Sequence, residues 1–142
     1  MPEILVVEDN PGDVVLLRTA FKRSGVVVSM VVVESGEEAL ALLRDRERVF
    51  ADMPDLIILD LNLPGIRGTE TLKEIKADPT LRSIPVVVWT SSESEEDVRS
   101  SREEQANGYT VKPTSIKKLV EFVSEIDSWW LRKLYRNPGT EH

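Results

Sequence analysis

Short apolar runs alternate with amphipathic segments along the whole chain. The runs are rich in Val, Ile and Leu and are apolar on both faces, which is typical of strands buried in a parallel sheet. The expected strands are residues 4–7, 26–33, 56–59, 84–89 and 108–111. The segments with apolar residues at helical spacing are residues 10–24, 35–48, 68–77, 93–106 and 115–135. This alternation predicts an α/β fold with one doubly wound parallel sheet, helices on both faces and right-handed crossovers.

Residues 54–65 contain the central strand and the turn that follows it. The apolar residues 56–59 run directly into Asp60, and Pro64 and Gly65 mark a turn shortly afterwards. In open α/β sheets, ligands bind beyond the carboxyl ends of the strands, so a carboxylate at this position is placed for chemistry. The alternative is that Asp60 only caps the next helix, and this segment alone does not decide between the two.

Composition narrows the classes of site and partner. The 142 residues fit one domain, and a formal net charge of -7 argues against nucleic acid as a partner, because acidic surfaces repel phosphates. There is no cysteine, and the single histidine is the last residue, His142, so a thiolate or histidine metal site is not expected. The N-terminus lacks the features of a signal peptide, and no apolar run approaches the roughly 18 residues of a membrane span. We therefore expect a cytoplasmic protein without membrane contact.

Polar side chains follow four of the five expected strands. Glu8 and Asp9 follow the first strand, Asp60 the third, Thr90 the fourth and Lys112 the fifth. In a doubly wound sheet these positions converge on one edge, and neighbouring carboxylates there need a cation or a raised pKa. Oxygen ligands without His or Cys favour Mg²⁺ or Mn²⁺. A carboxylate nucleophile near such an ion, a hydroxyl and an ammonium suits phosphoryl transfer to the carboxylate, although Lys112 alone could be a surface lysine and Thr90 alone a helix cap.

This set of residues resembles the receiver domain of two-component response regulators over about residues 3–125. The match rests on Glu8-Asp9, on Asp60 within Leu-Asp-Leu-Asn-Leu-Pro-Gly, on Thr90 after Val-Val-Val-Trp and on Lys112-Pro113. The resemblance implies a flavodoxin-like (βα)5 fold with strand order 2-1-3-4-5. It also implies that Asp60 accepts a phosphoryl group from the phosphohistidine of a histidine kinase, so that the chain is a phosphoacceptor rather than an enzyme.

The resemblance further implies a Mg²⁺ site. Glu8, Asp9 and Asp60 would hold the ion together with the backbone carbonyl of Asn62. Glu8 departs from the family pattern, because many members have Asp at this position. We expect its longer side chain to reach the metal through a water molecule.

By the same resemblance, Thr90 and Lys112 bind the phosphoryl oxygens. Tyr109 matches the aromatic switch residue, whose ring turns inward when Thr90 moves toward the phosphate. The alternative for Tyr109 is a fixed aromatic side chain on an edge strand. The family also implies a cis peptide bond before Pro113, since proline is the residue at which a cis bond is tolerated.

Two other functions remain open from the sequence alone. A haloacid-dehalogenase-type phosphatase would also use an Asp nucleophile and Mg²⁺ at a strand end. That family needs a second Asp two residues after the nucleophile, however, and Asn62 stands there. A degenerate receiver that signals by binding alone is the other alternative, and the complete set of acids, Thr90 and Lys112 argues against it.

The last expected helix carries more apolar surface than one face requires. Its stripe, enough to pack on the sheet, consists of Ile116, Leu119, Val120, Val123, Ile126 and Trp130. Phe122 and Trp129 lie off this stripe, and monomers rarely leave such a patch exposed. We expect a homodimer through this helix with Phe122, Trp129 and Trp130 as contacts, and the alternative is a tail that folds back over its own tryptophans.

The length left after this helix is too short for an effector module. We expect a receiver domain with an extended last helix over residues 1–136 and a flexible tail over residues 137–142. The output would then be another protein or the phosphoryl group itself. The segments Asn10-Pro11-Gly12-Asp13, Leu61-Asn62-Leu63-Pro64 and 126–131 resemble small stand-alone response regulators that serve bacterial phytochrome histidine kinases. This second resemblance implies a bacteriophytochrome as the kinase partner.

Overall fold

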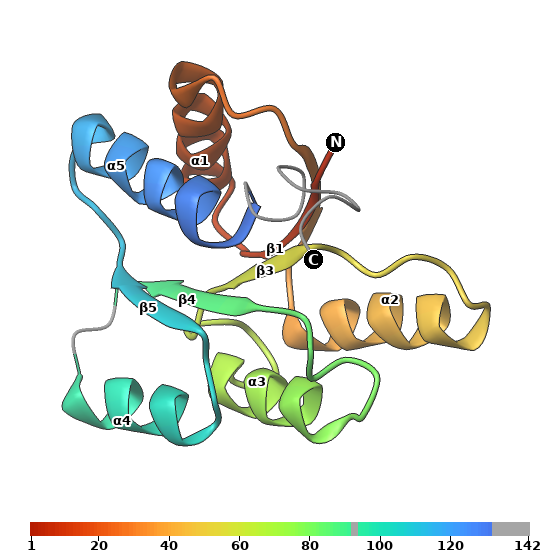
Figure 1. Ribbon diagram of the computed structural model, residues 1–142. Coiled ribbons are helices and arrows are strands. Elements are labelled where there is room, and N and C mark those ends of the chain that lie inside the picture. The colour runs from red at the N-terminus through yellow and green to blue at the C-terminus, as the bar shows by residue number, and fades with distance from the viewer. Residues whose placement is uncertain (92–93, 132–142) are drawn as a thin grey trace.

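The computed structural model describes residues 1–91 and 94–131 as a five-stranded parallel sheet with helices on both faces (Figure 1). The strands are β1 (Glu3–Val7), β2 (Ser29–Val33), β3 (Leu56–Leu59), β4 (Val86–Thr90) and β5 (Gly108–Val111). The helices are α1 (Pro11–Ser24), α2 (Gly36–Arg48), α3 (Gly68–Ala77), α4 (Glu95–Glu103) and α5 (Ile116–Ile126), followed by the π-helical turn η1 (Asp127–Leu131). The strand order is β2-β1-β3-β4-β5, and every pairing is parallel. The predicted α/β fold and its strand order are therefore confirmed.

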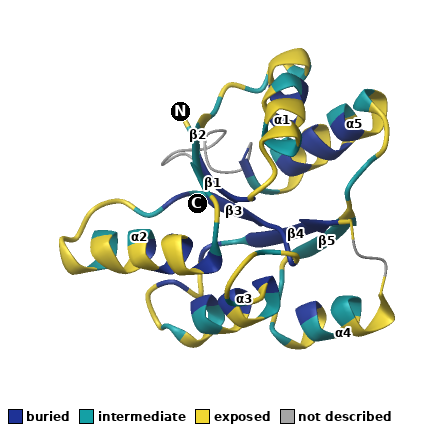
Figure 2. Ribbon diagram, turned by 180° about the vertical axis from the view of Figure 1, so that it is seen from behind, coloured by how far each residue is buried: buried dark blue, intermediate teal, exposed yellow. Residues whose placement is uncertain are grey.

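The helices form two layers around the sheet. Figure 1 shows α1 and α5 side by side on one face and α2, α3 and α4 on the other, and α1 contacts α5 directly. Alternate residues of a strand point to opposite faces, so Ile4 and Val6 of β1 join the core under α1 and α5, whereas Leu5 and Val7 join the core on the other face. Figure 2 shows the buried residues concentrated on the strands and on the inner sides of the helices. The central strands are thus apolar on both faces, as their sequence predicts.

The start of α1 is fixed by its own sequence. Asn10 is extended, and its side-chain oxygen accepts hydrogen bonds from the backbone N–H groups of Gly12 and Asp13 at 2.9 and 3.3 Å. Pro11 supplies a helical φ at a position where no N–H is needed. At the other end, Gly25 adopts a φ of 73°, which closes the helix in the left-handed conformation. The first turn of α1 therefore directly follows the end of β1, beside Glu8 and Asp9.

The last helix differs from the sequence prediction. The α-helical part ends at Ile126 and a π-helical turn follows, so the regular helix is shorter than expected within the described residues. Phe122 is only 5% exposed, because its ring stacks on Trp89 of β4 with the ring centroids 6.2 Å apart. Phe122 is therefore mainly a core residue that also lines a hollow with Trp129 and Trp130, and its predicted contact with a second copy stays a prediction. The wider π turn also brings Leu131 into the core.

Two further outcomes concern the ends of the chain. Residues 132–142, which include the expected tail 137–142, lie outside the described residues. No helix within the described residues combines the length and the apolar character that crossing a membrane would require.

Candidate functional site

The predicted polar residues meet at the carboxyl edge of the sheet. Glu8, Asp60 and Lys112 each lie one residue beyond a strand, and their backbone N–H groups continue the strand pairing. The N–H of Glu8 donates to β2 at 2.9 Å, that of Asp60 to β1 at 3.1 Å and that of Lys112 to β4 at 2.7 Å. Each backbone is thereby held in the sheet while its side chain projects from the edge. The placement that the sequence predicts for these residues is confirmed.

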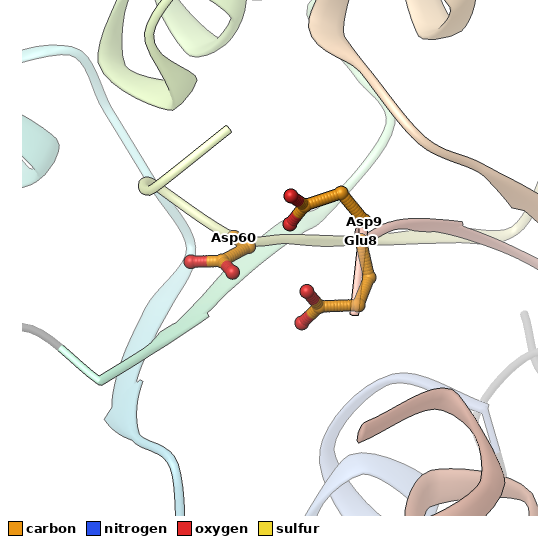
Figure 3. A group of neighbouring side chains, drawn as sticks. All are labelled: Glu8, Asp9 and Asp60. Atoms are coloured by element: carbon orange, nitrogen blue, oxygen red, sulfur yellow. The ribbon is translucent and has the colours of Figure 1, made fainter. Parts of the chain in front are cut away.

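Three carboxylates form a group that could hold a metal ion. Each of Glu8, Asp9 and Asp60 offers an oxygen that lies within 4.8 Å of the oxygens of the other two (Figure 3). Glu8 and Asp60 are 1% and 3% exposed, whereas Asp9 is exposed. Glu8 Oε1 is buried, and its contact is with the ammonium of Lys112, 2.7 Å away. Buried oxygen ligands of this kind suit a hard divalent cation such as Mg²⁺ or Mn²⁺.

Burial changes the titration of Glu8. Its removal from water, reinforced by the nearby charge of Asp60, raises the pKa of the Glu8 carboxyl to about 7. Lys112 and the N–H of Asn10, which donates to Glu8 Oε2 at 3.0 Å, act in the opposite direction and only partly offset the burial. Near neutral pH, a cation that binds this carboxyl therefore competes with a proton.

Lys112 is the positive counterpart of the acids. Its side chain is 14% exposed, and its Nζ lies 2.7 Å from Glu8 Oε1, 2.7 Å from Asp13 Oδ2 and 3.0 Å from Asp60 Oδ2. Burial alone would lower the pKa of Lys112, but these three carboxylates outweigh it and raise the pKa above that of an ordinary lysine. The Lys112 side chain therefore stays positively charged at neutral pH, next to Asp60, the predicted phosphoacceptor.

Asp13 is a site residue that the sequence prediction missed. The sequence places it in the first turn of a helix, where an acid is expected to help cap the helix. In the structure its carboxylate reaches Lys112 instead, across 99 positions of the chain. Only the spatial neighbourhood of α1 and the end of β5 shows this contact, although an acid so close to Glu8 and Asp9 was a usable signal.

Asn62 makes hydrogen bonds at the site that the sequence did not predict. Its backbone N–H donates to Asp60 Oδ1 at 3.0 Å, and its side-chain Nδ2 donates to the hydroxyls of Thr90 and Ser91 at 3.2 and 3.3 Å. The amide thus connects the acceptor carboxylate to the end of β4. The predicted role of the Asn62 carbonyl as a metal ligand stays a prediction.

Thr90 and Tyr109 lie where the sequence placed them, at the end of β4 and on β5. Thr90 is fully buried, and Tyr109 is half-buried against the core on the α2, α3 and α4 face. Their joint action as a switch stays a prediction. The expected cis peptide bond before Pro113 is wrong for this structure, where the bond is trans, the isomer favoured even for proline.

The site opens to solvent as a cleft of about 480 Å³. Its walls include Asp13, Asn62 and the segment from Lys112 to Thr114, in addition to the three acids. A carboxylate nucleophile, a metal-binding group and an ammonium therefore share one accessible space. This combination can accept a phosphoryl group on oxygen.

Comparison with known proteins decides the family. The family described as response regulator receiver domain matches residues 4–124, which is most of the chain. The chain belongs to the response regulator receiver family. This assignment removes the haloacid-dehalogenase alternative, since receiver domains are phosphoacceptors rather than classical enzymes.

Similar proteins of comparable length give this receiver domain its context. It is 40% identical to "Probable methanogenesis regulatory protein FilR2" of Methanothrix harundinacea, covering 96% of this chain and 87% of that protein. It is 41% identical to response regulator Rcp1 of Synechocystis sp., covering 90% of this chain and 88% of Rcp1. The crystal structure of the phosphorylated cyanobacterial phytochrome response regulator RcpA superposes with a TM-score of 0.83 at 43% identity, covering 93% and 95% of the two chains. The Mn²⁺-bound form of Rcp1 gives a TM-score of 0.81 at 40% identity, covering 92% and 95%.

Proposed function

We propose that this receiver domain accepts a phosphoryl group on Asp60 from the phosphohistidine of a histidine kinase. In this step, a carboxylate oxygen of Asp60 bonds to phosphorus, and the imidazole nitrogen leaves with the electron pair of the broken P–N bond. The observation that carries the proposal is the position of the Asp60 carboxylate, which is buried yet adjoins the cleft, within 3.0 Å of Lys112 Nζ. RcpA, a relative of the same fold, has been solved in a phosphorylated form, which supports the proposal.

Mg²⁺ is the proposed cofactor, held by Glu8, Asp9, Asp60 and the backbone carbonyl of Asn62. The buried Glu8 oxygen and the mutual approach of the three acids support a divalent site, and Rcp1 has been solved with Mn²⁺. When bound, the ion would neutralise negative charge on the phosphoryl oxygens. We assign Lys112 and Thr90 to the remaining oxygens, because Lys112 Nζ contacts the Asp60 carboxylate and Asn62 links that carboxylate to the Thr90 hydroxyl.

The proposed kinase is a bacterial phytochrome. Rcp1 and RcpA support this partner, since RcpA is described as a phytochrome response regulator. FilR2, at nearly the same identity, carries the name of a methanogenesis regulator, so the kinase has to be tested directly. Two large apolar side chains, Val15 and Leu16, are exposed on α1 in the turn that follows Asp13, and we propose this patch as part of the kinase contact.

Phosphotransfer from a purified, autophosphorylated bacterial phytochrome kinase tests the partner. We expect the label to move to the wild-type chain and not to Asp60→Asn. A double variant, Val15→Ser with Leu16→Ser, should slow transfer from the kinase while leaving phosphorylation by acetyl phosphate unchanged. If acetyl phosphate modifies the chain but no phytochrome kinase does, the receiver function stands and the phytochrome partner is wrong.

We also propose a homodimer that uses the surface around η1. Trp129 is 63% exposed, and with Trp130 it lines a hollow of about 300 Å³ beside β5 and α5. Tyr109, the proposed switch residue, lines the same hollow, so we expect phosphorylation to tighten the dimer. Sedimentation with and without a phosphoryl mimic measures this, and one unchanged mass in both states would count against it.

A further inference from the structure

The Lys112 ammonium contacts one carboxylate in addition to those of the acid group. An ammonium has three N–H donors, and three carboxylates surround this one, from Glu8, Asp13 and Asp60. Glu8 and Asp60 also belong to the group of acids that could hold a metal ion. Asp13 does not belong to that group, and its carboxylate contacts Lys112 instead.

The Asp13 carboxylate is delivered by a rigid element. Its own backbone N–H is bound by the Asn10 side chain, which fixes the first turn of α1. The contact to Lys112 therefore joins the start of α1 to the end of β5. The Asp13 side chain is 25% exposed and that of Lys112 is 14% exposed, so the pair is largely shielded from water and stronger than an ion pair on the surface.

The aromatic ring of Trp89 contacts the ammonium from the side of the core. Lys112 Nζ lies 5.2 Å from the centre of the Trp89 ring, within the range of a cation–π contact. The Trp89 ring is in turn stacked on Phe122 of α5. The lysine head thus lies between the face of a buried, stacked aromatic ring and a carboxylate on α1.

We propose that Asp13 is a positioning residue that holds the Lys112 ammonium in place for the phosphoryl group. This inference rests on the proposed function of Asp60. Once a cation occupies the acid group and a phosphoryl group is attached to Asp60, the oxygens of Glu8 and Asp60 acquire other partners. Asp13 keeps its hold on one N–H of Lys112 and leaves the other N–H groups for phosphoryl oxygens. Without it, a long and flexible side chain would have to be ordered each time.

Beryllofluoride, a phosphoryl mimic that binds without transfer chemistry, provides the test. The measurement uses the full chain with Trp129→Phe and Trp130→Phe, which leaves Trp89 as its one tryptophan. The Lys112 ammonium lies over this ring, so Trp89 fluorescence reports its position. With saturating Mg²⁺, Asp13→Asn should weaken beryllofluoride binding by about tenfold, equivalent to about 1.4 kcal/mol. The affinity for Mg²⁺ alone should change by less than about twofold, because Asp13 is outside the acid group.

Three further variants separate positioning from a general structural effect. Asp97→Asn is the matched control, since Asp97 is also the third residue of its helix and pairs with a cation, Arg67, at 3.4 Å. It should change neither affinity. Asp13→Glu keeps the charge, and the adjoining cleft has room for the longer side chain, so it should restore beryllofluoride binding. In a Lys112→Met background, Asp13→Asn should have no further effect, because Asp13 acts through Lys112.

The outcomes are distinguishable. Unchanged or tighter beryllofluoride binding in Asp13→Asn would overturn the positioning role, and tighter binding would mean that Asp13 withholds the ammonium. An equal loss of Mg²⁺ affinity would also overturn it, by showing that Asp13 acts on the metal. If the wild-type chain itself fails to bind beryllofluoride, the proposed function of Asp60 fails instead.

Discussion

At the scale of single residues, the site depends on how four acids and one lysine share a small, partly buried space. Lys112 compensates part of the negative charge, and Asp9 remains in solvent. Burial disfavours the charged form of the Glu8 carboxyl and raises its pKa to about 7. A divalent ion and a proton therefore compete for the same buried carboxylate.

This competition predicts that Mg²⁺ affinity depends on pH. Below the Glu8 pKa the ion must displace a proton, so the affinity should fall by up to about tenfold per pH unit as the pH drops from 7 to 5.5. Above the pKa the affinity should level off. Mg²⁺ titrations followed by tryptophan fluorescence measure this dependence. Glu8→Gln, which cannot titrate, should show a much flatter profile, and an equally steep profile in that variant would contradict the assignment to Glu8.

The same pKa predicts how the metal-free protein responds to pH. Its value in the folded state, about 7, lies above the ordinary value of 4.5, so the folded state binds the Glu8 proton more tightly than the unfolded state does. The contribution to stability is full below pH 4.5 and is lost as the pH rises through 7. In the presence of a chelator, the free energy of unfolding measured in urea should fall less between pH 5 and pH 8 for Glu8→Gln than for wild type. Equal losses would contradict this account.

Much of the site was predictable from residues at strand ends. Asp60, Thr90 and Lys112 follow apolar runs, and runs of this kind place their last residues at the sheet edge. Asp13 and the Asn62 side chain were not predictable in the same way. Both lie in local patterns with a common alternative role, a helix cap and a turn, and their partners are distant in sequence.

At the scale of elements, the buried face of α5 differs from the apolar stripe that the sequence predicts. Leu119, Phe122 and Ile126 are spaced by three and four residues and are all buried. The predicted stripe was rotated slightly about the helix axis relative to the buried face, so it did not include Phe122. The signal was present in the spacing, but a stack with Trp89 is visible only in three dimensions.

This division of α5 predicts different effects for two aromatic residues. Phe122→Ala should lower the free energy of unfolding by about 3–5 kcal/mol, because it leaves a cavity against Trp89. Trp129→Ala should change it by less than about 0.5 kcal/mol in the monomer, since most of its side chain is exposed. Urea unfolding at low protein concentration measures both, and the proposed dimer predicts that Trp129→Ala weakens self-association. Similar losses of stability in the two variants would contradict the division.

A lysine on α3 holds two connecting segments away from the site, the one between α3 and β4 and the one before β5. Lys76, near the end of α3, donates to the carbonyls of Arg82 and Ile84 and to Asn107 Oδ1, all at 2.9–3.0 Å. Burial lowers its pKa. Lys76→Met keeps the apolar stem but removes the donor to the carbonyls of Arg82 and Ile84, which should cost about 1–3 kcal/mol of unfolding free energy. Lys73→Met on the exposed side of α3 is the control, and equal unfolding midpoints for the two variants would refute the role of Lys76.

Element boundaries were less predictable than elements. The second strand was expected over residues 26–33 but begins at Ser29, because its partner β1 begins at Glu3 and the two are paired in register. A run of valines predicts extended backbone, and only the neighbouring strand decides how much of it is paired. The π turn η1 likewise follows from packing of Trp130 and Leu131 rather than from any motif.

At the scale of the whole molecule, one topology accounts for the site. The order β2-β1-β3-β4-β5 places β1, β3, β4 and β5 with their carboxyl ends along one edge, and the residues that follow those ends form the cleft. Two separate cores, one on each face, hold this edge in place. The fold could be predicted from the sequence because both the alternation of elements and the apolar strands point to it independently.

The central claim is that Asp60 is the phosphoacceptor, and intact-mass measurement tests it most directly. The full chain is incubated with acetyl phosphate and Mg²⁺, alongside Asp60→Asn and a sample in chelator. We predict one added phosphoryl group on the wild type and none in either control. No added mass on the wild type, or an equal addition to Asp60→Asn, would contradict the account.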